Sequence, residues 1–314
     1  MLPALNDVAV LFLFFARPEQ TQAVFEQIRL ARPAKLFLYQ DGPRPNRPDD
    51  IENIAKCREI VEQIDWECEV YRMYQKQNFG CDPSEYISQK WMFSIVDKGI
   101  ILEDDDVPSQ SFFPFCKELL DRYEHDDRIN MICGMNNIDT YTDSCPYSYF
   151  FTRTGSIWGW ATWKRNIDLW DPNYKFLDNP YYVRLIQEQE GAQASSLFKK
   201  VKTHKDSGRE HYESILGMHR RLWGQLNIVP TLNMITNIGI GANTTHSTSD
   251  IKLLPPASRR LLYKKRHEIP FPLKHPEYIV EDRGYEQKMY KAMHVPFLVK
   301  AFYKIKRICY KIKQ

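Results

Sequence analysis

The chain has 314 residues, of which 43% are hydrophobic and 26% charged, and its net charge is +3. This is the composition of a globular protein with a sizeable core, and it excludes a chain that is disordered throughout. Six basic side chains in residues 295–314 account for the positive sign, because acids outnumber bases in the rest of the chain. A body of this charge lacks the basic surface that nucleic acids require, so we expect no nucleic-acid partner.

The cysteines and the apolar runs indicate the cellular compartment of the protein. The seven cysteines form no C-x-x-C pair, which favours a reducing compartment over a disulfide framework. The first residues lack the basic region of a signal peptide, and no apolar run is long enough to span a bilayer. The sequence therefore predicts a cytoplasmic protein.

The first half of the chain alternates short apolar runs with stretches of helical periodicity. The apolar runs predict strands at residues 8–15, 35–40, 67–73, 99–103 and 130–134. Helices are expected between them at residues 18–31, 49–63, 83–97 and 109–125, with Pro18 and Pro83 at first helical positions and Asp82 as a cap. Strands that alternate with helices predict a mostly parallel sheet with helices on its faces.

The second half is less regular. Residues 147–175 are crowded with aromatic and turn residues, residues 180–225 have a mainly helical pattern, and residues 227–235 are typical of a strand. From residue 251 onward the chain is basic and rich in proline, which predicts a peripheral extension.

Four consecutive acids follow the apolar run 99–102: Glu103, Asp104, Asp105 and Asp106. Such a run is typical of a central strand covered on both faces, and ligands of open α/β sheets bind beyond the carboxyl ends of the strands. Neighbouring carboxylates repel one another unless a cation compensates them, and carboxylate oxygens favour Mg²⁺ or Mn²⁺, which often bridge to phosphates. The alternative is a solvated turn in which Asp106 caps the next helix.

The segment Leu-Glu-Asp-Asp, followed by Phe112 and Phe113, resembles the metal-binding motif of GT-A-fold glycosyltransferases. It looks closest to bacterial family-2-like enzymes and is distantly similar to N-acetylglucosaminyltransferase I. The resemblance implies a GT-A (Rossmann-like), mostly parallel central sheet flanked by helices, with a helical and irregular C-terminal extension. It also implies that Asp105 holds Mn²⁺ or Mg²⁺, and that Glu103 and Asp104 lie against the nucleotide and the donor sugar.

Two further strand ends fit the same family pattern. Arg17, after the first strand, matches an arginine that approaches the nucleotide. Asp41 matches an aspartate that accepts a hydrogen bond from a uracil-type base, which favours a UDP-sugar, although Asp-Gly after a strand is also a common turn. On this resemblance residues 1–135 form the nucleotide-sugar-binding half, residues 136–250 the acceptor-binding and catalytic half of the same domain, and residues 251–314 the basic extension.

Three tryptophans lie close together at Trp158, Trp160 and Trp163, with a glycine at Gly159. Glycines let the backbone approach a ligand, and indole rings stack on sugars. A hydrophobic knot that closes the sheet edge is the alternative. The family carries a similar Gly-Trp segment beside the donor sugar, so the resemblance implies that Trp158 and Gly159 contact it.

An inverting transfer needs a base that takes the proton of the acceptor hydroxyl. The resemblance implies Glu213, which falls where relatives place an aspartate in a Trp-Asp-Tyr context. The tryptophan of that context is missing here, and Glu210 and Asp206 are rivals. The segment 237–246 resembles an Asn-Ile-Gly-x-Gly-x-x-x-Thr-His segment of these transferases, which implies His246 as a second metal ligand.

Residues 297–313 place apolar side chains on one side of a helix and lysines and arginines on the other. This pattern is typical of a helix that lies on an anionic membrane surface, and the alternative is a terminal helix docked on the body. A peripheral position on the inner face of the membrane would suit an enzyme that acts on a glycolipid.

Taken together, these features predict a metal-dependent, inverting glycosyltransferase. It would move a sugar from a nucleotide-diphosphate donor to a hydroxyl of a glycan or glycolipid acceptor, in the synthesis of cell-surface polysaccharide or lipopolysaccharide. The alternatives are a catalytically inactive relative that binds glycans or nucleotides, and a metal-dependent sugar nucleotidyltransferase. The latter also uses paired acids, but the glycine-rich basic loop typical of its first strand is absent from the sequence.

Overall fold

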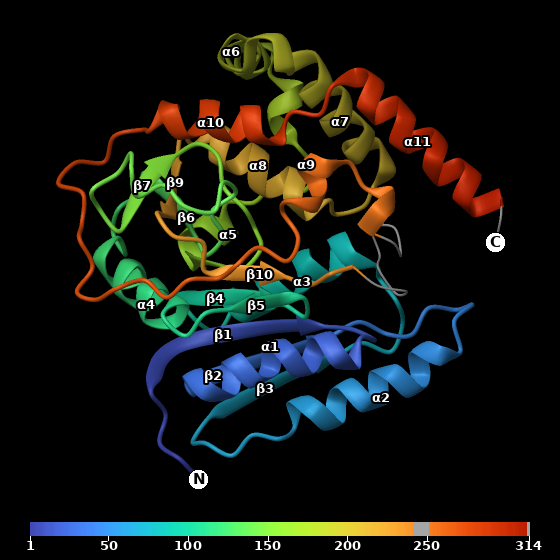
Figure 1. Cartoon of the computed structure of the whole chain (residues 1–314), viewed down its shortest axis with the longest axis vertical. Helices are drawn as coiled ribbons and strands as arrows, with labels where there is room; N and C mark the ends of the chain where they lie inside the picture. The colour runs from blue at the N-terminus through green and yellow to red at the C-terminus, as the bar shows by residue number, and fades with distance from the viewer. Residues whose placement is uncertain (241–250, 313–314) are drawn as a thin grey trace.

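The computed structural model describes residues 1–240 and 251–312 (Figure 1). Its main element is an eight-stranded sheet with the strand order β3-β2-β1-β4-β8-β6-β9-β7. The strands are β1 (Asn6–Phe14), β2 (Pro33–Gln40), β3 (Glu69–Tyr74), β4 (Lys98–Glu103), β6 (Ile129–Cys133), β7 (Tyr149–Thr152), β8 (Trp160–Trp163) and β9 (Leu226–Pro230). A small second sheet pairs β5 (Asp106–Pro108) with β10 (Ile235–Asn237).

The sheet is parallel through β3, β2, β1 and β4, and β6 also pairs with β9 in parallel. Strand β8 lies antiparallel between β4 and β6, and β7 is an antiparallel edge strand. The expected α/β class, with a large and mostly parallel sheet flanked by helices, is therefore confirmed.

Strand β1 shows how the sequence builds two cores. Its side chains alternate between the faces of the sheet, since successive residues of a strand point to opposite sides. Val10 and Phe12 pack into the core that contains α1 (Pro18–Ala31), α2 (Asp49–Val61) and α4 (Phe112–Arg122). Leu11 and Leu13 pack into the core on the other face, together with α3 (Cys81–Phe93), α5 (Lys164–Asp168), α6 (Pro180–Glu190), α7 (Ala194–Ser207) and α8 (Tyr212–Leu222). The mainly helical pattern of residues 180–225 is confirmed by α6, α7 and α8.

Two boundaries differ from the prediction. Helix α3 begins at Cys81 and not at Pro83, because Gly80 takes the N-cap position with φ 86° and Asp82 does not cap the helix. The strand expected at 227–235 is two strands in two different sheets. Between them the side chain of Asn233 accepts from the Asn136 amide (3.1 Å) and donates to the Ile235 carbonyl (2.7 Å), which fixes the turn.

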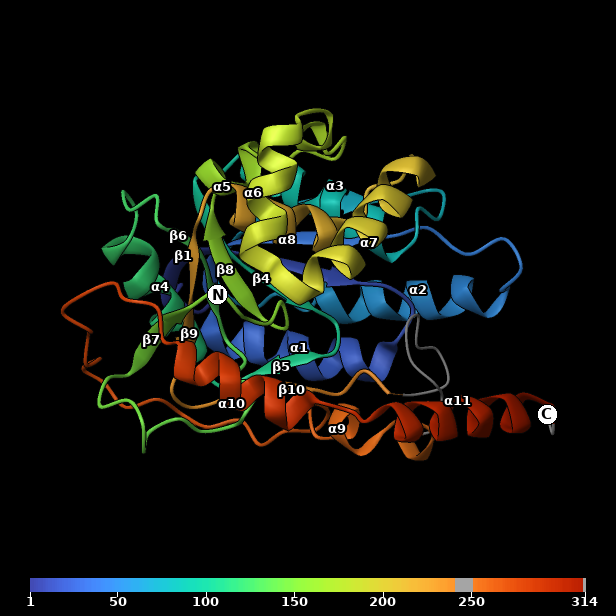
Figure 2. The same ribbon diagram turned by 90° about the horizontal axis from the view of Figure 1, so that it is seen from above.

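The segment after residue 251 packs on the body and contains α9 (Pro256–Arg259), α10 (Arg283–Met293) and α11 (Phe297–Ile312). The Glu268 carboxylate accepts from the amides of Gln110 (3.1 Å) and Ser111 (2.7 Å), immediately before α4 begins. Tyr285 of α10 is completely buried. Helix α11 confirms the predicted terminal helix and extends beyond the body (Figures 1 and 2). Among the described residues, no helix is long and apolar enough to cross a membrane.

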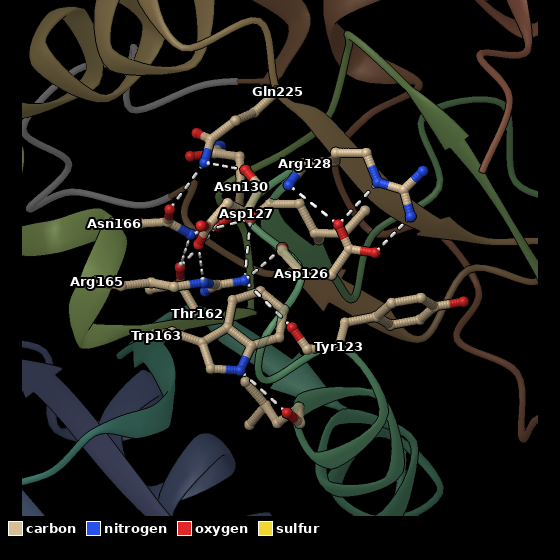
Figure 3. Close-up of polar contacts among 12 residues, drawn as sticks. Tyr123, Asp126, Asp127, Arg128, Asn130, Thr162, Trp163, Arg165, Asn166 and Gln225 are labelled. Atoms are coloured by element: carbon tan, nitrogen blue, oxygen red, sulfur yellow. Dashed lines mark hydrogen bonds and ion pairs between the residues drawn. The ribbon is translucent and has the colours of Figure 1, made fainter.

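A buried polar network closes the sheet where β6 begins and β8 ends (Figure 3). The Asn166 amide nitrogen donates to the carbonyls of Ile129 (3.1 Å) and Asn130 (2.6 Å), and its oxygen accepts from Gln225 (2.9 Å). Because Trp163 of β8 pairs with Lys98 at the start of β4, this network lies at the opposite end of the sheet from the acid cluster.

Candidate functional site

The four acids lie where β4 ends and β5 begins. Glu103 is the last residue of β4 and Asp106 the first of β5, so Asp104 and Asp105 form the turn between two strands that belong to different sheets. Asp104 is 4% exposed and Asp106 is fully buried. The turn is therefore held on both sides by strands, while Glu103 and Asp105 are half-buried.

Arg17 brings the neighbouring strand end into contact with this turn. Its Nε lies 3.3 Å from Asp104 Oδ2 and its Nη1 lies 2.9 Å from Asp105 Oδ2, and Nη2 forms a further contact with Asp104. Burial alone would lower the pKa of the Arg17 guanidinium, but the two aspartates outweigh it and raise that pKa. The predicted assembly of Arg17, Asp104 and Asp105 at one edge of the sheet is thus present in the structure.

Asp106 has a structural position. Its carboxylate accepts from Asn237 Nδ2 (3.0 Å) and from the Gly159 amide (3.0 Å). The alternative in which Asp106 caps the next helix is wrong, since Asp106 begins β5 and Ser111 is the residue before α4. Gly159 has φ +61°, and a Cβ there would lie 2.4 Å from Ile235 Cδ1. Gly159 therefore supports the acid turn through its amide, which donates to Asp106. It does not line the outer cavity described below.

Asp41 follows β2 directly and organises the loop that leads into α3. Its carboxylate accepts from the amides of Gly42 (2.9 Å), Phe79 (3.0 Å) and Gly80 (2.9 Å). Burial raises the pKa of Asp41, and the backbone donors oppose that shift. Asp41 therefore forms the Asp-Gly turn that was the alternative to contact with a base. It also lines a cavity.

Two adjoining cavities lie against these groups, with volumes of about 410 and 110 Å³. They share Arg17, Cys81 and Glu103 as lining residues. The smaller one extends toward Asp41, and we call it the inner cavity. The larger one, which we call the outer cavity, is lined among others by Asp105, Trp158, His204, His211, Glu213 and Asn237.

Some of the other predicted site residues line the outer cavity and others do not. Trp158 and Glu213 line the outer cavity, whereas Glu210 and Asp206 are not among its lining residues. Trp160 and Trp163 are buried in the two cores, so the hydrophobic-knot alternative describes them. His246 lies outside the described residues.

A stacked histidine pair in the outer cavity was missed from the sequence. The rings of His204 and His211 lie 3.8 Å apart, and His211 Nδ1 is 3.3 Å from Asp82 Oδ2. They come from the end of α7 and the residue before α8, where a break at Gly208 folds the two helices together. No periodic pattern marks this pair, because their proximity arises from that break.

The electrostatics of the cavities favour a cation. The Glu103 carboxylate has no hydrogen-bond partner within residues 1–240 and 251–312, and it lines both cavities. Burial, followed by repulsion from Glu85 and the neighbouring aspartates, raises its pKa well above the usual value. Burial likewise raises the pKa of Glu85 to about 8. Several acids therefore share the guanidinium of Arg17 as a countercharge.

These residues fit a hard divalent cation as part of a larger coordination sphere. Glu103 offers unpaired oxygens, and Asp105 lies beside the outer cavity. No group of three His, Cys, Asp or Glu side chains that could hold a metal exists among the residues the structure describes. Mg²⁺ commonly takes one or two carboxylates from the protein and its remaining ligands from phosphates and water, and this arrangement matches that pattern.

The fold and the site define an α/β protein with an acidic cavity beyond the carboxyl ends of β1, β2 and β4. No family model matches the sequence, and no curated protein matches it. Among solved structures, UDP-glucose pyrophosphorylase complexed with UDP-glucose is similar at 10% identity and a TM-score of 0.29, over 52% of this chain and 81% of that one. An apo UDP-glucose pyrophosphorylase is similar at 9% identity and a TM-score of 0.36, over 73% and 93%. Likeness this remote says nothing about what this chain binds.

Proposed function

We propose that this protein is a divalent-metal-dependent, inverting glycosyltransferase that uses a nucleotide-diphosphate sugar, with UDP as the nucleotide. The observation that carries the proposal is the half-buried carboxylate of Glu103, which has no partner among the described residues and lines both cavities beside Asp105. Ligands of open α/β sheets bind at this edge, and the strand ends of β1, β2 and β4 all supply polar groups to it.

In this proposal the two cavities bind different parts of the donor. The inner cavity, bounded by Asp41 and Arg17, would take the nucleoside, and the outer cavity would take the diphosphate and the sugar. Glu103 and Asp105 would hold Mn²⁺ or Mg²⁺, which when bound neutralises charge on the departing diphosphate. Trp158 would stack on the donor sugar from the wall of the outer cavity.

Glu213 supplies the base in this proposal. It lies in the first turn of α8, lines the outer cavity and has an exposed side chain. Its carboxylate would take the proton of an acceptor hydroxyl while that oxygen bonds to the anomeric carbon. The bond between that carbon and the diphosphate breaks, and the nucleoside diphosphate leaves with the electron pair.

The test is a calorimetric titration with a panel of nucleotide sugars, with and without Mn²⁺. We expect at least one nucleotide sugar to bind, with affinity that depends on the metal. Release of a nucleoside diphosphate on incubation would support glycosyl transfer. Formation of a nucleoside triphosphate when pyrophosphate is added would instead identify a nucleotidyltransferase, and binding without either product an inactive relative. No binding of metal or nucleotide sugar would reject the proposal.

We further propose that the protein acts at the inner face of a membrane on a glycan or glycolipid acceptor. The support is α11, in which Leu298, Phe302 and Ile305 are exposed. Apolar side chains exposed on a basic helix favour contact with anionic lipid. If deletion of residues 295–314 leaves binding to anionic liposomes unchanged, this part of the proposal is wrong.

A further inference from the structure

Arg220 of α8 is a buried cation without a partner. It is 9% exposed, and its guanidinium forms no hydrogen bond or ion pair within residues 1–240 and 251–312. Burial, with repulsion from Arg221, lowers the pKa of Arg220 to about 10, so the side chain still carries its charge at neutral pH. Burying an unpaired charge is unfavourable, and such a group is therefore expected to meet an anion in the working protein.

The two neighbouring arginines each have a carboxylate partner. Arg221 forms a two-point contact with Glu190, at 2.8 and 3.3 Å. The Nε of Arg153 lies 3.1 Å from Glu281. Glu286 accepts from the Thr152 hydroxyl (3.3 Å) and the Arg153 amide (3.2 Å). Glu286 pairs with no cation among the described residues, and it attracts Arg220 together with Glu190. Of the three arginines, Arg220 is therefore the one whose guanidinium has no direct partner among the described residues.

Arg220 lines two further cavities, of about 530 and 560 Å³, which share Arg153, Thr154, Arg220, Arg221 and Met289. We call the pair the arginine channel. The first of them also shares Ile157 and Glu213 with the outer cavity. The arginine channel therefore begins at the proposed base and runs away from the acids, on the side where an acceptor would approach Glu213.

The chemistry of the channel favours a phosphate. Four basic side chains line the cavity against α10, namely Arg153, Arg220, Arg221 and Lys291, whereas two acidic ones do, Glu190 and Glu286. A guanidinium presents parallel N–H donors that match two oxygens of a phosphate, and a phosphate monoester carries nearly two negative charges. We infer that the arginine channel binds a phosphate group of the acceptor through Arg220, and so positions the acceptor hydroxyl against Glu213. That the phosphate belongs to an acceptor rests on the proposed function, whereas the phosphate site itself rests only on the geometry around Arg220.

The test is a titration of the metal-free protein with inorganic phosphate, read by calorimetry and by the melting temperature. The variant is Arg220→Met, and the matched control is Arg184→Met, an exposed arginine of α6 that pairs with Glu188 (2.7 Å) outside the channel. We expect the wild type and the control to bind phosphate equally, and Arg220→Met to bind it at least ~tenfold more weakly. Without phosphate, Arg220→Met should melt at the wild-type temperature or above, because it removes a buried charge that forms no direct hydrogen bond or ion pair among the described residues.

Either of two results overturns the inference. One is equal phosphate affinity in Arg220→Met and the wild type. The other is a melting temperature that falls by several degrees in Arg220→Met without phosphate, which would make Arg220 a structural residue. Should Arg220→Met fail to fold, Arg153→Met replaces it, since the Arg153 side chain is half exposed. That variant should bind phosphate several-fold more weakly, and unchanged affinity would again reject the site.

Two probes separate the sources of the phosphate. Glucose 1-phosphate tests a soluble sugar phosphate, and phosphatidylcholine vesicles that contain phosphatidic acid test a lipid-borne one. Binding that weakens in Arg220→Met with one probe identifies that source, and no weakening with either overturns the inference. These measurements use neither donor nor metal. Failure of nucleotide-sugar binding would therefore reject the proposed function but not the phosphate site. Failure of phosphate binding would reject the phosphate site but not the proposed function.

Discussion

Arg17 and Asp105 meet through a 2.9 Å contact between Nη1 and Oδ2, across the ends of two neighbouring parallel strands. The register of β1 and β4 pairs Leu13 with Glu103, so the residues that follow each strand must emerge side by side. Arg17 therefore compensates part of the negative charge of the turn and holds it in place. The remaining charge, on Glu103 and its neighbours, is what a divalent cation would compensate.

The first prediction concerns Asp105. Asp105→Ala should abolish metal-dependent binding of the nucleotide sugar, because it removes a proposed metal ligand. It should leave the melting temperature unchanged or slightly higher, because the variant also relieves repulsion between Asp105 and the neighbouring carboxylates. Calorimetry with Mn²⁺ and a melting curve check both parts. Asp168→Asn, on the exposed surface of α5, is the control and should bind donor like the wild type. Wild-type donor affinity in Asp105→Ala would remove Asp105 from the site.

Much of the first half of the fold could be predicted because its patterns are local. The apolar runs of β1 and β4 and the periodicity of α1 need no tertiary information, and parallel order then brings Arg17 to the acids. Strand β8 was missed because its four residues lie in an aromatic segment without clear alternation. Arg220 was missed because a basic residue in an amphipathic helix is usually solvated, and its burial depends on tertiary packing around α8.

The second prediction tests whether Gly159 has a structural role. Gly159→Ala should lower the free energy of unfolding by about 3 kcal/mol, because a positive φ is unfavourable for alanine and the new Cβ would overlap Ile235. Gly208 has a similar φ of +64° in the left-handed helical region, but no atom lies within 4 Å of the position that a Cβ would take, so Gly208→Ala should cost about 1 kcal/mol. Urea unfolding measures both, and equal costs would show that the contact with Ile235 is unimportant.

The third prediction concerns the polar network at the far end of the sheet (Figure 3). Asn166→Ala should lower the free energy of unfolding by about 1–3 kcal/mol, because two buried carbonyls and the Gln225 amide each lose one of their two partners. Donor binding by the folded fraction should be unchanged, since the network lies away from the acids. Asn173→Ala, at an exposed position, should be close to neutral. A loss of donor affinity in Asn166→Ala at temperatures where it is folded would contradict this separation.

The fourth prediction concerns pH. Burial lowers the pKa of His219, which is 3% exposed, from 6.5 to about 4. The unfolded chain therefore binds the proton more readily than the folded one. The contribution of His219 to stability should be full above about pH 6.5 and should fall by up to about 3 kcal/mol as the pH drops toward 4. His219→Leu should flatten this part of the profile, measured by urea unfolding at several pH values. His125→Leu is the control, because that residue is exposed. A steep profile in His219→Leu would assign the pH dependence elsewhere.

The last prediction separates the rival bases. Glu213→Gln keeps the shape of the side chain but removes its ability to take a proton, so it should spare donor binding and lower the rate of transfer by about 10²–10⁴-fold. Glu210→Gln, three residues earlier and outside the lining of the outer cavity, should retain transfer. Because both variants remove one negative charge from neighbouring positions, a general electrostatic effect would lower both rates alike. Transfer that survives Glu213→Gln and disappears in Glu210→Gln would move the base to Glu210, and with it the point from which the arginine channel begins.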